Sequence, residues 1–191
     1  MSHVHVVYAH PAPQSFTREV LGAFLGGLAE AGHTASVSDL YAQGFRAGLS
    51  AEEYARETGR GAHVPVAPDV TVEQERLAAA DVWAFVYPVW WNDCPALLKG
   101  WFDRVWTAGW AYEPMTLRPA RSALVLCTSG HGAADLEASG CYPAMRTTML
   151  ADRIGARAAH ADFVLFGGQL NGGEAGRREH LRRAAALGRE V

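Results

Sequence analysis

Residues 80–105 read ADVWAFVYPVWWNDCPALLKGWFDRV, and this stretch indicates the fold most clearly. The run at 82–87 is continuously apolar, which is typical of a central parallel strand, because such a strand is buried on both faces. Helical spacing follows over 95–108, with Pro95 near the first turn, a position that proline favours. We therefore predict a strand, a loop and a helix in immediate succession.

The same alternation continues on both sides of this unit. Further strands are predicted at 4–9, 34–40, 123–127 and 161–166. Further helices are predicted from Ser15 to a C-cap at Gly32, and at 72–80, 142–154 and 174–189. Strands that alternate with helices indicate an α/β fold, namely a doubly wound, five-stranded parallel sheet with helices on both faces.

The chain of 191 residues suits one domain, residues 1–191, with its own core. Weak periodicity at about 41–69 predicts a loop insertion with one short helix at 51–57. No internal repeat is found.

Composition excludes several classes of function. The chain is 49% hydrophobic and 19% charged, and its net charge of −3 gives no basic field for nucleic acid. No apolar run approaches the roughly 20 residues that span a membrane, and no signal peptide is recognised. The three cysteines have neither disulfide nor metal spacing. We expect a cytoplasmic protein with no metal site and no nucleic-acid or membrane partner.

Ligands of open parallel sheets bind beyond the carboxyl ends of the strands. This rule nominates the loops at 10–17, 88–95 and 128–132. In the first loop, Ser15 can cap a helix whose free amides at Phe16 and Thr17 suit a phosphate; alternatively, Ser15 only caps the helix. No GxGxxG motif and no Walker lysine accompany it, which disfavours a dinucleotide-binding Rossmann site.

The other two loops suit a flat heterocycle. Trp90 and Trp91 are adjacent in a loop, where two indoles are costly unless they cover an apolar ligand, the alternative being core or dimer contacts. The sequence TSGHG at 128–132 offers small side chains and accessible amides.

Longer motifs carry a specific resemblance. The chain contains HPxPxSF at 10–16, Glu73-Gln74, PxxWxxxPAxLKGWxDRV at 88–105 and GWAY at 109–112. In these motifs the chain resembles the NAD(P)H:quinone oxidoreductase family, the DT-diaphorase-like branch of the flavodoxin superfamily. The similarity covers residues 3–132 and is densest at 88–112.

The resemblance implies a flavodoxin-like fold and roles for individual residues. The flavin phosphate or pyrophosphate would be held by His10, Ser15, Phe16 and Thr17, and the ribityl or phosphate region contacted by Gln74. The isoalloxazine would be lined by Pro88, Val89, Trp90, Trp91 and Asn92, and faced by a turn made of Thr128, Ser129, Gly130 and His131. The distal cofactor would be touched by Glu174 and Arg177, and the substrate side roofed by Tyr112.

The resemblance also implies an activity. The cofactor is FAD or FMN, the hydride donor is NAD(P)H, the acceptor is quinone-like, and one shared slot gives ping-pong kinetics. A homodimer is implied, with both subunits contributing to each pocket. The chain departs from the family at Asn92, Pro114 and His131, where aromatic, tyrosine and glycine residues are usual. We hypothesise that His131 supplies a proton or a hydrogen bond at the flavin edge.

Three alternatives stay open. One is a flavodoxin-type electron carrier or a regulatory flavin-binding subunit. Another is a flavin reductase whose acceptor is an azo compound, a nitro compound or a biosynthetic intermediate. The third is a hydrolase that uses Ser129, although the chain lacks GxSxG.

Overall fold

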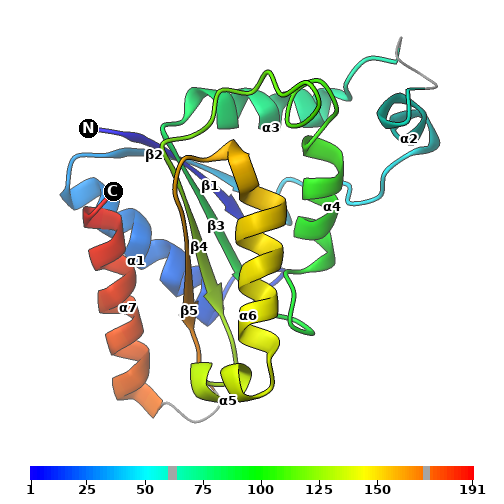
Figure 1. Ribbon diagram of the computed structural model, residues 1–191. Helices are drawn as coiled ribbons and strands as arrows, with labels where there is room; N and C mark the ends of the chain where they lie inside the picture. Colours follow the sequence, from blue (N-terminus) through cyan, green and yellow to red (C-terminus); the bar gives the residue numbers. More distant parts are fainter. Residues whose placement is uncertain (60–63, 170–172) are drawn as a thin grey trace.

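A parallel sheet forms the centre of the molecule. The computed structural model describes residues 1–59, 64–169 and 173–191, and its five strands lie in the order β2-β1-β3-β4-β5 (Figure 1). The strands are β1 (His3–Tyr8), β2 (Thr34–Asp39), β3 (Val82–Pro88), β4 (Ser122–Thr128) and β5 (Ala161–Phe166). All neighbouring pairs are parallel. The predicted doubly wound sheet is confirmed, and its order is the flavodoxin-like one.

Helices cover both faces of the sheet. The α-helices are α1 (Phe16–Glu30), α2 (Ala51–Glu57), α3 (Pro68–Ala79), α4 (Ala96–Val105), α5 (Ala133–Ala138), α6 (Cys141–Arg146) and α7 (Gly173–Arg189). Figure 1 shows α1 and α7 side by side on one face, with α4 and α6 on the other. Within the described ranges, no helix combines the length and the apolar character needed to cross a membrane.

Strand β3 divides the core into two layers. All seven of its residues are buried, as predicted for a central strand. Val82, Ala84 and Val86 pack in the layer under α1 and α7. Trp83 and Phe85 pack in the opposite layer, where Phe85 lies 5.9 Å from Trp101 of α4 between ring centroids.

Two glycines allow α1 and α7 to approach closely. A Cβ at Gly27 would lie 2.0 Å from the carbonyl oxygen of Ala185, and one at Gly188 would lie 2.3 Å from that of Phe24. Any side chain at either position would force the helices apart. Gly32, after α1, has a φ of +78°, which confirms its predicted place at the helix end.

The structure corrects three helix boundaries. Helix α3 begins at Pro68 rather than at 72, because proline fits the first helical turn. Helix α4 ends at Val105, three residues earlier than predicted. The segment predicted as one helix at 142–154 is the short α6 followed by a π-helix, Thr147–Ile154, and the six-residue α5 before it was not predicted.

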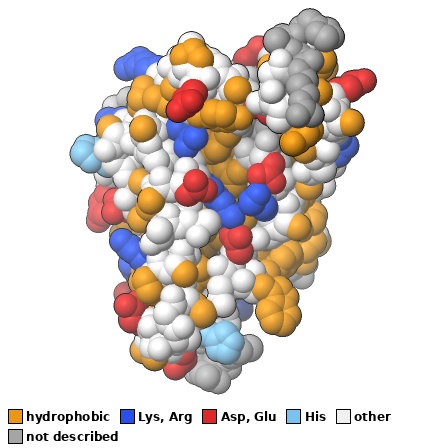
Figure 2. Space-filling model, turned by 45° about the vertical axis from the view of Figure 1, so that its right-hand side comes forward, with side chains coloured by type: hydrophobic (Ala, Val, Ile, Leu, Met, Phe, Trp, Pro, Cys, Tyr) orange, Lys and Arg blue, Asp and Glu red, His pale blue; other side chains and the backbone are white. Residues whose placement is uncertain are grey.

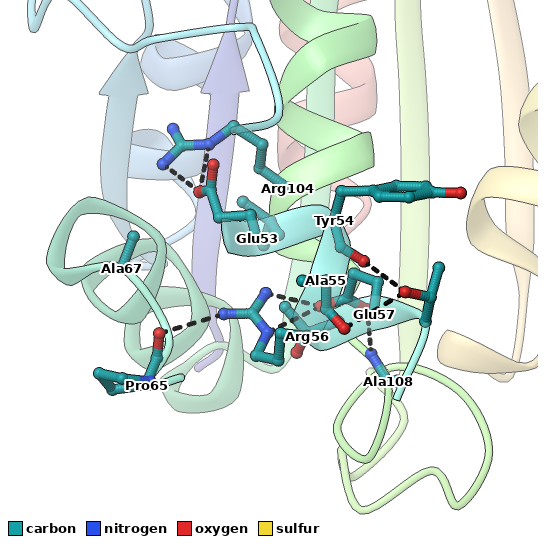
Figure 3. Close-up of polar contacts among 12 residues, drawn as sticks. Glu53, Tyr54, Ala55, Arg56, Glu57, Pro65, Ala67, Arg104 and Ala108 are labelled. Atoms are coloured by element: carbon teal, nitrogen blue, oxygen red, sulfur yellow. Dashed lines mark hydrogen bonds and ion pairs between the residues drawn. The ribbon is translucent and has the colours of Figure 1, made fainter. Parts of the chain in front are cut away.

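The predicted insertion holds α2, which matches residues 51–57. Ser50 and Glu53 form a reciprocal capping box at its start. Arg104 of α4 is buried and donates to Glu53 at 2.8 Å, while Glu57 at the other end accepts from the Ala108 amide at 2.7 Å (Figure 3). These contacts anchor α2 to α4 and to the segment after it.

Candidate functional site

The three nominated loops meet at the carboxyl edge of the sheet. The Thr17 and Thr128 hydroxyl groups, from the first and third loops, lie 2.8 Å apart, and both residues are buried. The Val89 amide donates to the Thr128 carbonyl at 2.8 Å, which joins the second loop to the third. The His10 and Trp90 rings lie 6.3 Å apart between centroids. The loops therefore border one site.

The first loop presents the start of α1. The Ser15 hydroxyl accepts from the Arg18 amide at 3.1 Å, so Ser15 is the N-cap, as predicted. The amides of Phe16 and Thr17 occupy the first turn, where a helix offers no internal acceptors. Nδ1 of His10 accepts from the Ala12 amide at 3.0 Å, which leaves Nε2 of the neutral ring as a donor. This end of the site suits an anion such as a phosphate.

The second loop contains a tight turn of non-glycine residues. Trp90 and Asp93 exchange both backbone hydrogen bonds, at 2.9 and 3.0 Å. Between them, Trp91 and Asn92 have φ values of +51° and +58°, in the left-handed region that most side chains avoid. Trp91 is 100% exposed, so the chain's own core does not account for this indole. Trp91 is therefore not a core residue, which leaves a ligand or a dimer contact as the alternatives for this indole.

The third loop packs against the chain that follows β5. The Ser129 amide donates to the Phe166 carbonyl at 3.2 Å, and the His131 carbonyl accepts from the Gly168 amide at 2.9 Å. A Cβ at Gly167 would lie 2.7 Å from the His131 oxygen, so this approach requires glycine at 167. His131 itself is exposed. Among the described residues, the non-glycine residues with a positive φ are Trp91 and Asn92, so the backbone of His131 is not left-handed and a side chain is tolerated at this position.

A cavity of about 480 Å³ lies between the second and third loops. It is lined by Val89, Trp90, Trp91, Asn92, Ser129, Gly130, His131 and Leu136. This volume falls in the range of small-molecule sites, roughly 300–1,000 Å³. The cavity has an apolar wall of indoles on one side and a turn of small residues on the other, and the start of α1 lies beyond Thr128. This arrangement fits a flat ring that carries a phosphate tail.

Two predicted site residues lie away from this cavity. Nε2 of Gln74 donates to the Val105 carbonyl at 2.9 Å and to the Thr107 hydroxyl at 3.0 Å, so Gln74 joins α3 to the end of α4. The Tyr112 hydroxyl donates to Glu57 at 2.7 Å. Helix α4 starts beside the cavity, and its ten residues rise roughly 15 Å to Val105, which Gln74 contacts. Tyr112 lies in the segment that follows this end of the helix. Within one chain, neither Gln74 nor Tyr112 lines this cavity, and the predicted roles of the two residues toward the flavin and the substrate stay predictions.

Tyr112 belongs to a second hollow on the face that carries α4. This groove of about 270 Å³ is lined by Lys99, Phe102, Asp103, Trp106, Tyr112, Asp152, Arg153 and Arg157. Figure 2 shows apolar side chains at its floor with basic and acidic groups beside them. Burial and the neighbouring Glu57 carboxylate raise the pKa of Tyr112 to about 12, so its hydroxyl stays a donor at neutral pH.

The two predicted α7 residues behave differently. Arg177 forms an ion pair with Glu19 of α1, and its guanidinium lies 5.4 Å from the centre of the Phe16 ring. It therefore stands beside the phosphate end of the site. Glu174 is exposed and lies 3.7 Å from Arg178 on its own helix. The structure gives Glu174 no contact with the loops of the site among the described residues.

Asp93 and Arg153 were missed by the sequence reasoning. Arg153 donates to both carboxylate oxygens of Asp93, at 2.6 and 2.9 Å. Burial opposes ionisation of Asp93, but the Arg153 and Cys94 donors outweigh it and lower the pKa of Asp93. Asp93 stands at a variable position of the motif at 88–105, and Arg153 lies 60 positions further on and outside that motif, so only the tertiary structure could pair them.

In the order β2-β1-β3-β4-β5, the direction in which strands are added reverses between β1 and β3, and the cavity lies beyond the carboxyl ends of the strands near this point. The protein is therefore a doubly wound α/β protein with a ligand site at the carboxyl edge of its sheet. The chain belongs to the family described as flavodoxin-like fold, whose profile matches residues 2–185. The predicted resemblance to NAD(P)H:quinone oxidoreductases is confirmed by individual relatives.

A solved NAD(P)H:quinone oxidoreductase from Methanothermobacter marburgensis is 48% identical, with a TM-score of 0.94 over 99% of this chain and 95% of that one. A ribosyldihydronicotinamide dehydrogenase [quinone] from Pongo abelii is 37% identical over 123 residues, 58% of this chain and 53% of the relative. The chain thus spans about half the length of such curated relatives. An FMN-dependent NADH-azoreductase from Bacillus anthracis, solved with FMN, is 16% identical with a TM-score of 0.74 over 100% of this chain and 99% of that one, which shows a shared fold alone.

Proposed function

We propose that this chain binds a flavin nucleotide, FAD or FMN, and reduces a quinone-like acceptor with NAD(P)H. One observation carries the proposal: the indole wall at 90–91, the turn at 128–132 and the free start of α1 border a single site. The similarity to a quinone oxidoreductase over 95% of that chain supports the same activity.

The chain's own groups would have distinct tasks. A bound flavin would supply the redox chemistry, namely hydride transfer between NAD(P)H and the acceptor. The amides of Phe16 and Thr17, with His10, would bind its phosphate. Backbone amides of the turn at 129–132 would stabilise negative charge at the ring edge, as an oxyanion hole does. His131, exposed at that edge, would donate a hydrogen bond there.

The absorption spectrum of the purified protein tests the cofactor directly. We expect a yellow protein, release of FAD or FMN identified by mass, and parallel double-reciprocal lines when NAD(P)H and quinone are varied together. A protein that stays colourless after incubation with FMN and with FAD would contradict the proposal. Flavin reduction by NADPH without turnover of any quinone, but with turnover of azo or nitro compounds, would reassign the acceptor.

We further propose a homodimer in which Tyr112 of one copy closes the cavity of the other. The groove beside α4 supports this arrangement, because its apolar floor and its charges of both signs suit a copy of the same face. Sedimentation velocity at micromolar concentration should give twice the monomer mass of 20.6 kDa, and a monomer would contradict the dimer. A single-domain organisation and a cytoplasmic location stay predictions.

A further inference from the structure

The turn that walls the cavity needs an external support. Trp91 and Asn92 both have left-handed backbone; asparagine tolerates this region, but a bulky residue such as tryptophan is unfavourable there. Its two reciprocal backbone bonds close it at Trp90 and Asp93. Trp91 is fully exposed, so burial of its indole gives the turn no support within the chain.

Asp93 is the point at which the turn is fastened. Its Oδ1 accepts from Nη1 of Arg153 at 2.6 Å and from the Cys94 amide at 2.7 Å, and its Oδ2 accepts from Nη2 of Arg153 at 2.9 Å. A planar guanidinium that meets a carboxylate with two parallel bonds fixes both position and orientation. Asp93, the last residue of the turn, is therefore fixed in position and in orientation.

Arg153 is itself rigidly held. It is 5% exposed, lies 5.5 Å from the centre of the Phe102 ring, and contacts the sulfur atoms of Cys94 and Met149. It belongs to the π-helix Thr147–Ile154. Its own carbonyl accepts from the Trp106 indole at 2.7 Å. Among the described residues, Asp93 is the carboxylate with which the buried Arg153 guanidinium forms an ion pair, and no other carboxylate does so.

We propose that Arg153 is a positioning residue, which acts through Asp93 to hold the turn at 90–93 in the conformation that walls the cavity. The expected effect of Arg153 on flavin affinity rests on the proposed function. The expected effect of Arg153 on the conformation of the turn does not rest on it, because all of these contacts lie within the chain.

The test compares two buried arginines that each bind a carboxylate with two donors. Arg153→Lys keeps the charge but loses the two-pronged contact with Asp93. Arg104→Lys is the matched control: Arg104 is also buried and also donates twice to one carboxylate, that of Asp69, but it contacts neither the turn nor the cavity. Both variants are expected to lose stability.

The first readout is the set of indole ¹⁵N–¹H signals of the protein without flavin, with Trp83 of the core as internal reference. In Arg153→Lys we expect the Trp90 and Trp91 signals to shift or broaden and the Trp83 signal to stay. In Arg104→Lys the Trp90 and Trp91 signals should not move. Unchanged Trp90 and Trp91 signals in folded Arg153→Lys would overturn the inference.

The second readout is the dissociation constant of added FMN and of FAD. We expect Arg153→Lys to raise it at least tenfold for the nucleotide that the wild type binds, and Arg104→Lys to change it less than threefold. A wild type that binds neither nucleotide would refute the proposed function, whereas the indole signals would still decide the role of Arg153. If Arg153→Lys fails to fold, Asp93→Asn takes its place, because it removes the carboxylate and keeps Arg153, and the same outcomes decide.

Discussion

The hydroxyl groups of Thr17 and Thr128 lie 2.8 Å apart in a buried position between the start of α1 and the end of β4. This contact joins the phosphate end of the proposed flavin site to the turn that faces the ring. Thr17 is 2% exposed and Thr128 is 7% exposed, so water has little access to either side chain.

Thr17→Val should therefore lower both stability and flavin affinity. The substitution preserves shape but leaves the Thr128 hydroxyl unpaired, which costs about 1–3 kcal/mol of unfolding free energy. Urea unfolding measures the loss, and flavin titration measures the affinity. Thr147→Val, at an exposed position, is the control and should change stability by less than about 0.5 kcal/mol. Equal behaviour of the two variants would contradict the role of the contact.

Gly188→Ala should destabilise the protein by about 1–3 kcal/mol, as overpacking does. The new Cβ would lie 2.3 Å from the Phe24 carbonyl oxygen, so α1 and α7 must separate. Gly176 lies on the same helix, where an added Cβ would meet nothing within 4 Å, and Gly176→Ala should raise stability by up to about 1 kcal/mol through helix propensity. Urea unfolding should show that Gly188→Ala lowers the free energy of unfolding and that Gly176→Ala raises it. A change of the same sign in both variants would refute the close approach of α1 and α7.

His5 should make stability depend on pH between about 6.5 and about 4. Burial, with Arg76 and His3 nearby, lowers the pKa of His5 from 6.5 to about 4. The unfolded chain then binds a proton in this window that the folded chain does not, so stability is full above pH 6.5 and falls as the pH is lowered toward 4.

The contribution of His5 is isolated by comparison with His5→Gln. The slope of unfolding free energy against pH should be shallower in the variant by up to about 1.4 kcal/mol per pH unit. His160→Gln, at an exposed position, is the control for the loss of an imidazole elsewhere in the chain. A wild-type slope in His5→Gln would show that another group titrates in this range.

Tyr112→Phe should weaken acceptor binding and leave flavin content unchanged. The variant loses the hydrogen bond that the Tyr112 hydroxyl donates to Glu57, so the ring proposed to close the cavity of the other copy is held less firmly. A loss of about 0.5–1.5 kcal/mol raises KM for the acceptor by up to about 12-fold. Steady-state kinetics with a quinone measures the change. Tyr54 is 56% exposed, and Tyr54→Phe serves as the control with unchanged KM. If both variants match the wild type, Tyr112 does not reach an acceptor.

Local sequence was enough to predict the elements with strong periodicity. The continuously apolar β3 and the amphipathic α1 and α7 were predicted because one or both faces of each are buried, and burial dictates residue type. The π-helix Thr147–Ile154 was not predicted, because a one-residue widening of helical turns leaves no periodic trace over eight residues. Helix α5 has six residues, which is too short for a periodic pattern.

The amino-acid pattern was sufficient to predict the parallel sheet, the three loops at its carboxyl edge and the residues that line the cavity at 89–92 and 129–131. It was sufficient because adjacent residues share one loop, and parallel strands place such loops at one edge. The folded chain was needed to show that Gln74 contacts the far end of α4 rather than the cavity, that Tyr112 lines a different groove, and that Arg153 fixes Asp93. Those relationships depend on helix length and on side chains that meet across the fold, which no local pattern encodes.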